Sequence, residues 1–335
     1  TGPGARAGPH GRAGRGAIGT LSGSIPIGQQ LRRDEVRADP FGPVGYRRRM
    51  PTDAEFLALE RIDDQRFSFG VVNHLARLDG RLYGGTAIAA SIAAAEEVTQ
   101  RPAVWMTTQF VATAPPEQQV TVTVEVLAPG RRTNQVGAKG TDPDGQVMFA
   151  SLGATGHHRD GLEGQYENRP EVESPERAPE WGGPLASRAE LAGSEPPPIP
   201  PDLGFRASVE FREPAVADHP DDGPGRLCLW ARRRDHAPFT PALAAFVADM
   251  VPLSVSHAAG VVAGGTSLDN TIRVGSFAEP TEWVLLDMRP HLAAGDYGHG
   301  EVHIWSESGQ LLATASQSSS MFRFDPSNHP WEQRS

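Results

Sequence analysis

The chain has 335 residues, 38% of them hydrophobic, and a formal net charge of −10. Residues 1–49 hold nine arginines and three acidic residues, a balance of +6, which leaves −16 for the rest. An acidic body argues against nucleic acid as the main partner. The single cysteine, Cys228, excludes an intrachain disulfide and a cysteine-based metal cluster. No apolar run approaches the length of a membrane span, so we expect none.

The first residues differ in composition from the rest of the chain. Residues 1–49 are dominated by small residues and arginine at their start, and they lack the apolar core of a secretory signal. Globular patterning begins after Met50. We therefore expect 1–49 to be a disordered or non-native extension, 50–158 to be the first domain, and the protein to be cytoplasmic.

The first domain is predicted to contain one long helix among several strands. Thr52 and Glu55 form the sequence signature of a capping box at the start of a short helix over 51–58. Gly84 and Gly85 open an Ala-rich helix that is apolar nearly all round, which is typical of a buried helix. The apolar patterns predict strands at 67–75, 104–114, 119–128, 134–141 and 146–155.

A connection and a second domain follow. Residues 159–203 contain nine prolines and many glutamates, which indicates an extended polar linker. The pattern of the first domain then recurs over 204–325, ahead of a tail at 326–335. Thr240 and Pro241 are the N-cap and the first-turn proline of a second apolar helix. Strands are predicted at 226–234, 267–274, 282–290, 299–306 and 310–317.

The two domains are related by an internal repeat. Residues 144–153 match residues 308–317 at a constant offset of 164, and each half runs strand, buried helix, then four strands. An antiparallel sheet has one face to bury, and a single long helix can fill that face. The sequence therefore predicts one α+β unit present twice.

One acid lies inside the second apolar helix. Asp249 stands among Ala, Val, Phe and Met between Thr240 and Leu253. Burying a carboxylate without partners is costly, so such an acid is hydrogen-bonded, neutral or functional. From the residues alone, a core carboxylate paired with backbone groups or with an arginine of 231–234 is as good an interpretation as a catalytic one.

Five short motifs follow one another in the repeated frame. They are Leu82-Tyr-Gly-Gly85, Ala248-Asp-Met250, Thr266-Ser-Leu-Asp-Asn-Thr271, Glu282-Trp-Val-Leu-Leu286 and Thr314-Ala-Ser-Gln-Ser-Ser-Ser-Met321. In this order they resemble the acyl-CoA thioesterase II family, over residues 65–157 and 225–323. The resemblance implies a tandem, or double, hotdog fold, in which two antiparallel sheets each wrap around a long central helix.

The resemblance also implies an active site. The family has an Asp on the second central helix, a Thr or Ser on the following strand and a Gln on the last strand. By motif these are Asp249, Ser267 and Gln317, which would hydrogen-bond the water that attacks a thioester carbonyl. The chemistry suits these residue types, because Asp249 can accept a proton while Ser267 and Gln317 fix the water. Direct attack by Asp249, giving an anhydride, is an alternative.

Two further pairs of residues are candidates for binding the substrate. Backbone N–H groups of Gly84 and Gly85, at a helix N-terminus, are placed to hold the carbonyl oxygen. Arg131 and Arg132 lie at a turn, where contact with CoA phosphates is the functional interpretation and simple solvation is the default.

The strand after Ser267 departs from the family pattern. Many members read Asp-His-Ser or Asp-His-Thr, then an aromatic residue, Phe and His. This chain has Asp269 and Asn270, and then Arg273 and Gly275. Asn270 keeps hydrogen-bonding ability but cannot titrate. We expect Asp269 and Asn270 to brace the strand, and Arg273 and Gly275 to reshape the acyl pocket.

The predicted function is hydrolysis of an acyl-CoA, or of an acyl-carrier thioester, to a carboxylic acid and a free thiol in fatty acid and lipid metabolism. A non-catalytic acyl-thioester-binding hotdog protein is an alternative. A hotdog enoyl-CoA hydratase is disfavoured, because such enzymes usually pair Asp with a nearby His, and His257 lies about two helical turns past Asp249.

The expected partners are few. We expect no cofactor, because CoA is part of the substrate. We expect no metal, because the adjacent His157 and His158 at the end of a strand point to opposite faces. A homo-oligomer is suggested by analogy alone.

Overall fold

The computed structural model describes residues 51–184, 202–217, 223–261 and 263–323. The predicted extension at 1–49 and the predicted tail at 326–335 lie outside the described residues, as do residues 185–201 of the predicted linker. The account below concerns the described part of the chain.

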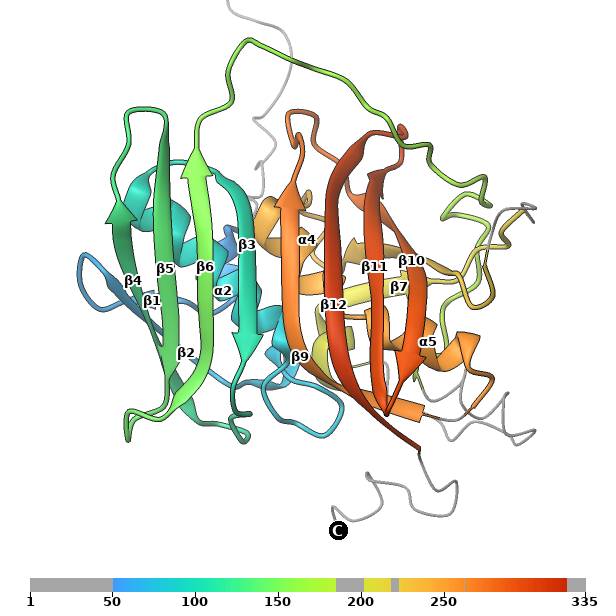
Figure 1. The fold of residues 1–335 in the computed structure, drawn as a ribbon, viewed down its shortest axis with the longest axis horizontal. Coiled ribbons are helices and arrows are strands. Elements are labelled where there is room, and N and C mark those ends of the chain that lie inside the picture. The colour runs from blue at the N-terminus through green and yellow to red at the C-terminus, as the bar shows by residue number, and fades with distance from the viewer. Residues whose placement is uncertain (1–50, 185–201, 218–222, 262, 324–335) are drawn as a thin grey trace, which may run out of the picture. The chain divides into compact units, whose positions relative to one another are not determined.

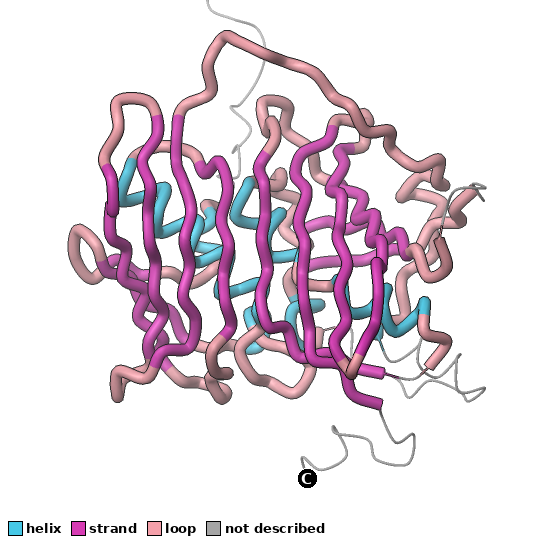
Figure 2. Tube along the Cα trace, in the orientation of Figure 1, coloured by secondary structure: helices cyan, strands magenta, loops and turns pink. Residues whose placement is uncertain are grey.

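Twelve strands form one antiparallel sheet in the order β1-β2-β4-β5-β6-β3-β9-β12-β11-β10-β8-β7 (Figures 1 and 2). Strands β1 to β6 come from the first half of the sequence and β7 to β12 from the second. The two predicted sheets therefore join edge to edge, at β3 and β9. The strands are β1 (Glu60–Arg61), β2 (Arg66–Gly70), β3 (Ala103–Phe110), β4 (Gln119–Ala128), β5 (Thr133–Thr141), β6 (Val147–Gly156), β7 (Val209–Arg212), β8 (Leu227–Arg233), β9 (Ala263–Val274), β10 (Trp283–Ala294), β11 (Tyr297–Ser306) and β12 (Leu311–Arg323).

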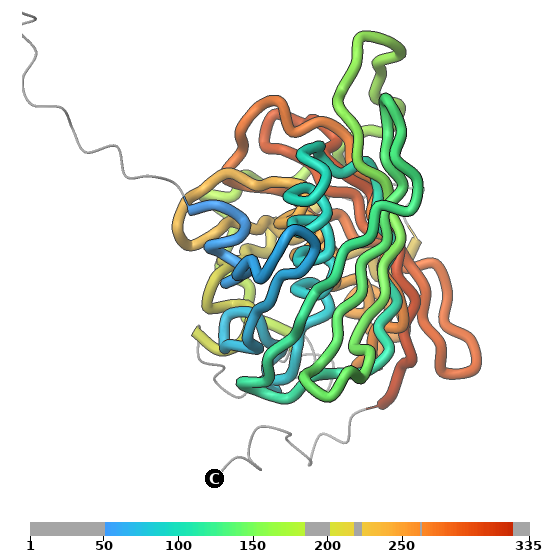
Figure 3. Tube along the Cα trace, turned by 90° about the vertical axis from the view of Figure 1, so that its left-hand side faces the viewer, coloured from blue at the N-terminus to red at the C-terminus, as the bar shows by residue number. Residues whose placement is uncertain are grey.

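The helices lie on one side of this sheet (Figure 3). They are α1 (Asp53–Phe56), α2 (Gly84–Thr99), α4 (Pro241–Ala248) and α5 (Val251–Ala258), with short 3-10 turns η1 (Asn73–Leu75) and η2 (Gly204–Ala207). The capping box at Thr52 and Glu55 is confirmed, since each side chain accepts the other residue's backbone N–H. The strand predicted at 67–75 ends at Gly70, and its last residues form η1 instead.

The two halves are related by a pseudo-two-fold axis between β3 and β9. Thr107 lies opposite Thr271 in the register, which is the same 164-residue offset that relates the sequence repeats. Their hydroxyl oxygens are 2.6 Å apart, so the equivalent residues of the two halves hydrogen-bond each other. The repeat seen in the sequence therefore appears in space as a symmetric junction between two sheet halves.

Small side chains bring the central helices close together. Eleven residues of α2, from Gly85 to Ala95, are buried, and most of them are alanines. A β-carbon on Gly85 would overlap the carbonyl oxygen of Phe246, so the start of α2 meets α4 backbone to backbone. Glycine is the residue that permits this approach.

The second central helix is interrupted at Asp249. The sequence predicts a continuous helix over residues 240–253, but α4 ends at Ala248 and α5 begins at Val251. In a continuous helix the N–H of residue 252 would bond to the carbonyl of Ala248, and Pro252 has no N–H and crowds that carbonyl. Asp249 is thereby left at a break in the backbone, with φ −81° and ψ 43°.

The interrupted segment is also the most apolar one. Pro241–Ala259 is long and apolar enough to cross a membrane by length and composition, which corrects the expectation that no apolar run approaches that length. However, 72% of its most apolar window is buried inside the protein. Buried core helices pass the same test, so this segment is weak evidence for a membrane span.

The predicted linker is not uniform. Val172 forms a β-bridge with Val216, and the buried Trp181 donates its backbone N–H to the carbonyl of Phe211. This part of the predicted linker therefore packs against the second half.

A second apolar cluster lies on the opposite sheet face from the helices, because its strand residues alternate with those of the main core. It consists of Ala178, Cys228, Trp230, Trp283, Leu285 and Trp305, so the single cysteine is a buried core residue.

Candidate active site

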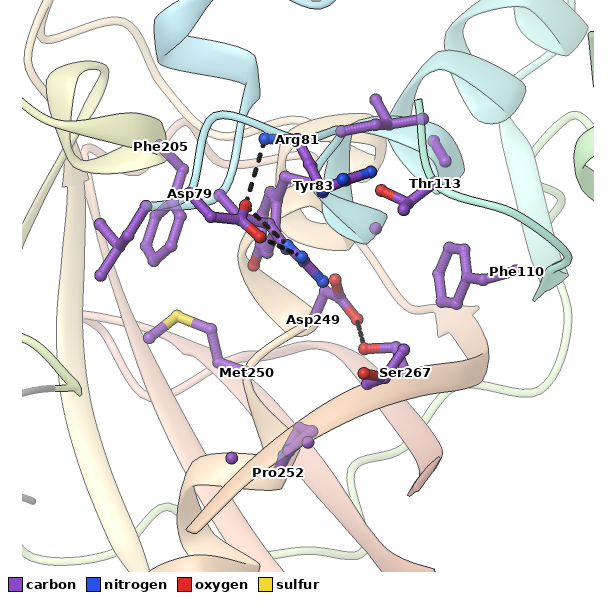
Figure 4. Close-up of a pocket in the computed structure, with 18 of the residues that line it drawn as sticks. Asp79, Arg81, Tyr83, Phe110, Thr113, Phe205, Asp249, Met250, Pro252 and Ser267 are labelled. Atoms are coloured by element: carbon purple, nitrogen blue, oxygen red, sulfur yellow. Dashed lines mark hydrogen bonds and ion pairs between the residues drawn. The ribbon is translucent and has the colours of Figure 1, made fainter. Parts of the chain in front are cut away.

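Three side chains from distant parts of the second half converge at the break after α4. Asp249 Oδ1 accepts a hydrogen bond from Ser267 Oγ at 3.1 Å and another from Gln317 Nε2. Gln317 Nε2 also donates to Ser267 Oγ at 2.7 Å. Figure 4 shows the Asp249–Ser267 contact within the surrounding pocket. The structure therefore brings together the three residues that the motifs single out.

The sheet determines how these partners approach Asp249. Strands β9 and β12 are hydrogen-bonded neighbours, and a register irregularity separates the pairs Ser318–Asp269 and Ser319–Ser267. Gln317 is 1% exposed and occupies a helix-facing position of β12. The irregularity lets Ser267 and Gln317 approach the same carboxylate although they are not paired with each other.

Burial dominates the electrostatics of Asp249. The side chain is removed from water, which raises the pKa of Asp249 from 3.8 to about 7. Hydrogen bonds from Ser267, Gln317 and the backbone N–H of Gly85, together with the charge of Arg77, act in the opposite direction and lower the pKa. A carboxyl group with a pKa near 7 is present in both protonation states at neutral pH, as a general base requires.

The start of α2 fits around the same carboxylate. Tyr83, the N-cap of α2, provides no side-chain cap, and the N–H of Gly85 donates to Asp249 instead. The side chain of Asp249 therefore caps a helix of the other half. A β-carbon on Gly84 would overlap Asp249 Oδ2. The N–H of Gly85 is thus bonded to the Asp249 carboxylate, whereas Gly84 lines the cavity beside that carboxylate.

A cavity of about 770 Å³ opens on this group of residues. Asp249 and Ser267 line it, whereas Gln317 lies behind them and reaches them through its amide. Most of the wall is apolar. The lining residues are Arg77, Leu78, Asp79, Arg81, Leu82, Tyr83, Gly84, Ala87, Phe110, Val111, Ala112, Thr113, Met148, Phe149, Pro184, Phe205, Asp249, Met250, Pro252, Leu253, Ser256, Gly264, Gly265, Thr266, Ser267 and Phe322.

The structure places the remaining predicted residues elsewhere. Asp269 accepts the backbone N–H of Ser318 at 2.8 Å, so it braces the β9–β12 pair. Asn270 is fully buried next to Gln317 in the register and does not line the cavity. Arg131 and Arg132 are exposed in the turn between β4 and β5, and neither lines the cavity.

The expectation that Arg273 and Gly275 reshape the acyl pocket is wrong. Neither residue lines the cavity. Arg273 lies toward the far end of β9 from Ser267, opposite Trp105 of β3 and Thr314 of β12. The physical reason is the length of β9: consecutive strand residues advance by about 3.3 Å, which puts position 273 roughly 20 Å along the strand from Ser267.

Sequence reasoning missed the polar residues of the loop before α2. Arg77 pairs with Asp79, and Arg81 lines the cavity beside them (Figure 4). Tyr83 is buried next to Asp249, and burial followed by the charge of that acid raises the pKa of its phenol well above the usual value. The signal was available, because these residues immediately precede the Gly84–Gly85 pair.

The pseudo-two-fold axis relates two equivalent sites, and only the one at Asp249 has polar side chains at the positions of Ser267 and Gln317. At the 164-residue offset, Ser267 corresponds to Ala103 and Gln317 to Gly153. Neither of these has a polar side chain. Among the described residues, no group of three or more His, Cys, Asp or Glu is arranged to hold a metal ion.

Family models match most of the two halves. An acyl-CoA thioesterase N-terminal domain matches residues 75–154, and an acyl-CoA thioesterase C-terminal domain matches residues 172–321. A solved structure from Novosphingobium aromaticivorans, designated a thioesterase, is 34% identical, covers 78% of this chain and 98% of its own, and superposes with a TM-score of 0.67. The chain belongs to the acyl-CoA thioesterase family.

Other solved structures share the fold of this acyl-CoA thioesterase family member. A hot dog protein from Alicyclobacillus acidocaldarius is 19% identical, covers 82% of this chain and 98% of its own, and has a TM-score of 0.67. An acyl-CoA thioesterase II from Mycobacterium marinum is 17% identical, covers 82% and 99%, and has a TM-score of 0.62. The predicted double hotdog is therefore confirmed. No curated protein that was compared matches the chain.

Proposed function

We propose that this thioester hydrolase cleaves acyl-CoA by water attack, with Asp249 as the general base. One observation carries the proposal: Asp249, Ser267 and Gln317 form a closed hydrogen-bonded group on the wall of a large, mostly apolar cavity. The family membership supplies the reaction class, and the geometry supplies the groups that the reaction needs.

The proposed first step is proton transfer to Asp249 as a water adds to the thioester carbonyl carbon. The resulting oxyanion needs a hydrogen-bond donor that is already in place. The backbone N–H of Gly84, at the start of α2, is the donor that we assign to it, because the N–H of Gly85 is engaged by Asp249.

The second step breaks the carbon–sulfur bond. The tetrahedral intermediate collapses, its C–S bond pair leaves with the thiolate, and Asp249 returns its proton to that sulfur. One water and one acyl-CoA become one carboxylic acid and one free CoA. Asp249 ends the cycle deprotonated, as it began.

The charged end of the substrate calls for cations at the cavity. Arg77 and Arg81 line it, whereas Arg131 and Arg132 do not. Guanidinium groups bind phosphates well through paired N–H donors. We therefore transfer the predicted phosphate contact from the β4–β5 turn to the loop before α2.

The acyl chain is assigned to the apolar wall. Phe110, Met148, Phe149, Met250 and Leu253 line the cavity near the acid. Burial of each methylene of a chain contributes about 0.8 kcal/mol, so such a wall favours a medium or long apolar acyl group over acetyl. This assignment supports the predicted role in fatty acid and lipid metabolism.

The test is a panel of acyl-CoAs of increasing chain length with a thiol reagent as the readout. The proposal expects thiol release from the wild type and its loss in Asp249→Asn. Single turnover in H₂¹⁸O tests the anhydride route: water attack on the thioester places ¹⁸O only in the product acid, whereas ¹⁸O in the carboxyl group of Asp249 would require an anhydride opened at the Asp249 carbonyl carbon. Absence of thiol release with every chain length, together with tight binding, would support the binding-protein alternative instead.

The hydratase alternative finds no support in the described residues. None of the residues that line the cavity is a histidine, and His257 lies in α5 outside that lining. The cytoplasmic location and the homo-oligomer both stay predictions.

A further inference from the structure

Three buried polar atoms that find no hydrogen-bond partner in the described part of the chain lie on two neighbouring residues. They are Nδ2 and Oδ1 of Asn270 and Oε1 of Gln317. Both side chains are almost completely buried, at 0% and 1% exposure. Leaving a buried polar group unsatisfied costs about 1–3 kcal/mol, so three of them beside the candidate catalytic acid call for a physical reason.

The sheet register places these two residues side by side. Asn270 of β9 is paired directly with Gln317 of β12. Side chains of directly opposed residues in an antiparallel pair point to the same face, with Cβ atoms about 5 Å apart. Both side chains end in an amide, and their unpartnered atoms are complementary: Nδ2 of Asn270 is a donor and Oε1 of Gln317 is an acceptor.

The orientation of the Gln317 amide decides whether Asp249 is supported. In the orientation seen, both N–H groups of Gln317 are used, one on Asp249 and one on Ser267. If the amide turned over, its oxygen would face the carboxylate and repel it. A donor on the opposite side, bonded to Oε1, holds the productive orientation.

We propose that Asn270 is a positioning residue, whose Nδ2–H donates to Gln317 Oε1 and thereby keeps the Gln317 amide directed at Asp249 and Ser267. The inference rests on the proposed function for its catalytic meaning. Asn270 does not line the cavity, so it acts through Gln317 and not on the substrate. An uncharged donor suits this task, because it orients the amide without adding a second titrating group beside Asp249.

Few other groups face the acid. They are Arg77 and Tyr83 from the loop before α2, the N–H of Gly85, and Ser267 from β9. None of these contacts Gln317 Oε1, which has no partner among the residues that the structure describes. Asn270 lies opposite Gln317 in the register, so we expect its replacement to act on Asp249 through Gln317.

Three variants of Asn270 separate positioning from packing. Asn270→Leu keeps the size and removes the donor. Asn270→Val suits a strand and has no hydrogen-bond donor, so it serves if the leucine variant does not fold. Asn270→Gln restores an uncharged N–H donor. The matched control is Ser151→Ala, which removes a buried, hydrogen-bonded hydroxyl from β6 on the same side of the sheet.

The experiment measures kcat/KM against pH, and the Asp249 carboxyl titration by ¹³C NMR. In Asn270→Leu and Asn270→Val we expect kcat to fall about tenfold with KM changed less than twofold, as for one lost hydrogen bond to a charged group. The acid limb of the kcat/KM profile and the midpoint of the Asp249 titration should both move to higher pH by about one unit. Asn270→Gln should restore both, and Ser151→Ala should shift neither.

An unchanged titration of Asp249 in both donor-free variants would overturn the inference, as would an equal shift in Ser151→Ala. The NMR readout does not need turnover. If the wild-type protein released no thiol, the proposed function would fail, while the titration would still decide whether Asn270 controls the environment of Asp249.

Discussion

Gly84 leaves open the space that the carboxylate of Asp249 occupies. A β-carbon at position 84 would overlap Asp249 Oδ2, and the neighbouring Gly85 donates its N–H to the same side chain. The acid comes from the second half of the chain, and the helix that it caps comes from the first. One active site is therefore built jointly by the two hotdog units, which explains why neither half could form it alone.

Gly84→Ala is expected to lower kcat/KM by about a hundredfold or more. The added methyl group displaces the carboxylate and obstructs the N–H assigned to the oxyanion, and loss of one such donor costs about that much. The folded state should survive, because the atom displaced ends a flexible side chain and Ala favours a helix. Steady-state kinetics and thermal unfolding measure the two effects.

Gly137→Ala is the control for that substitution. A β-carbon there meets only the side chain of Leu127, at 3.6 Å or more, which is an ordinary contact. Its activity should equal that of the wild type. Full activity in Gly84→Ala would remove the start of α2 from the mechanism.

The dependence of activity on pH should report Asp249 directly. Only its deprotonated form accepts a proton from water, and its pKa is about 7 because the side chain is buried. We expect kcat/KM to be level above about pH 8 and to fall tenfold per pH unit below about 6. A profile that stays level down to pH 5 would exclude Asp249 as the base.

Asp249→Asn should stabilise the protein at high pH while abolishing turnover. The pKa of Asp249 is about 7 in the folded protein and near 3.8 in the unfolded chain. The contribution of this carboxyl group to stability is therefore complete below about pH 4, and it is lost as the pH rises through 7. The neutral amide of the Asn variant does not pay the cost of burying a charge at high pH. We expect a gain of roughly 4 kcal/mol in the free energy of unfolding at pH 8, measured with urea.

The comparison at pH 4 is the control for this stability effect. Both proteins are then neutral at position 249, so the gain should disappear. Glu96 also has a pKa raised to about 7 by burial, but it is present in both proteins and cancels. A gain of equal size at both pH values would mean that the charge of Asp249 is not its cause.

The repeat and the two central helices could be predicted, because each leaves a local pattern in the sequence. The three converging residues could be predicted only from the resemblance of their motifs to the thioesterase family, since the residues alone allow a core role for Asp249. The break at Asp249 is not visible in the apolar pattern, which continues past Pro252 although proline lacks the N–H that a continuous helix needs there. The positions of Arg77 and Arg81 could not be found from periodicity, because they lie in an irregular loop whose path depends on packing against the other half.

Arg81→Ala should weaken the binding of acyl-CoA without slowing the chemistry. Arg81 lines the cavity, and removal of one phosphate contact should raise KM about tenfold with little change in kcat. A truncated thioester that ends at the pantetheine lacks the nucleotide phosphates, so its KM should not respond. The double variant Arg131→Ala and Arg132→Ala, outside the cavity, should leave KM for acyl-CoA unchanged. An equal rise in KM for both thioesters would refute the phosphate contact.

Pro252→Ala tests whether the break in the helix positions the acid. The alanine restores an N–H that can bond to the carbonyl of Ala248, which favours a continuous helix through Asp249. The carboxylate would then turn away from Ser267, and we expect kcat to fall at least tenfold while stability is kept or slightly increased. Pro241→Ala is the matched control, because Pro241 stands in the first turn of α4, where no N–H bond is missing. If Pro252→Ala retained full activity, the position of Asp249 would not depend on the break, and the hydrogen bonds from Ser267 and Gln317 would be enough to hold it.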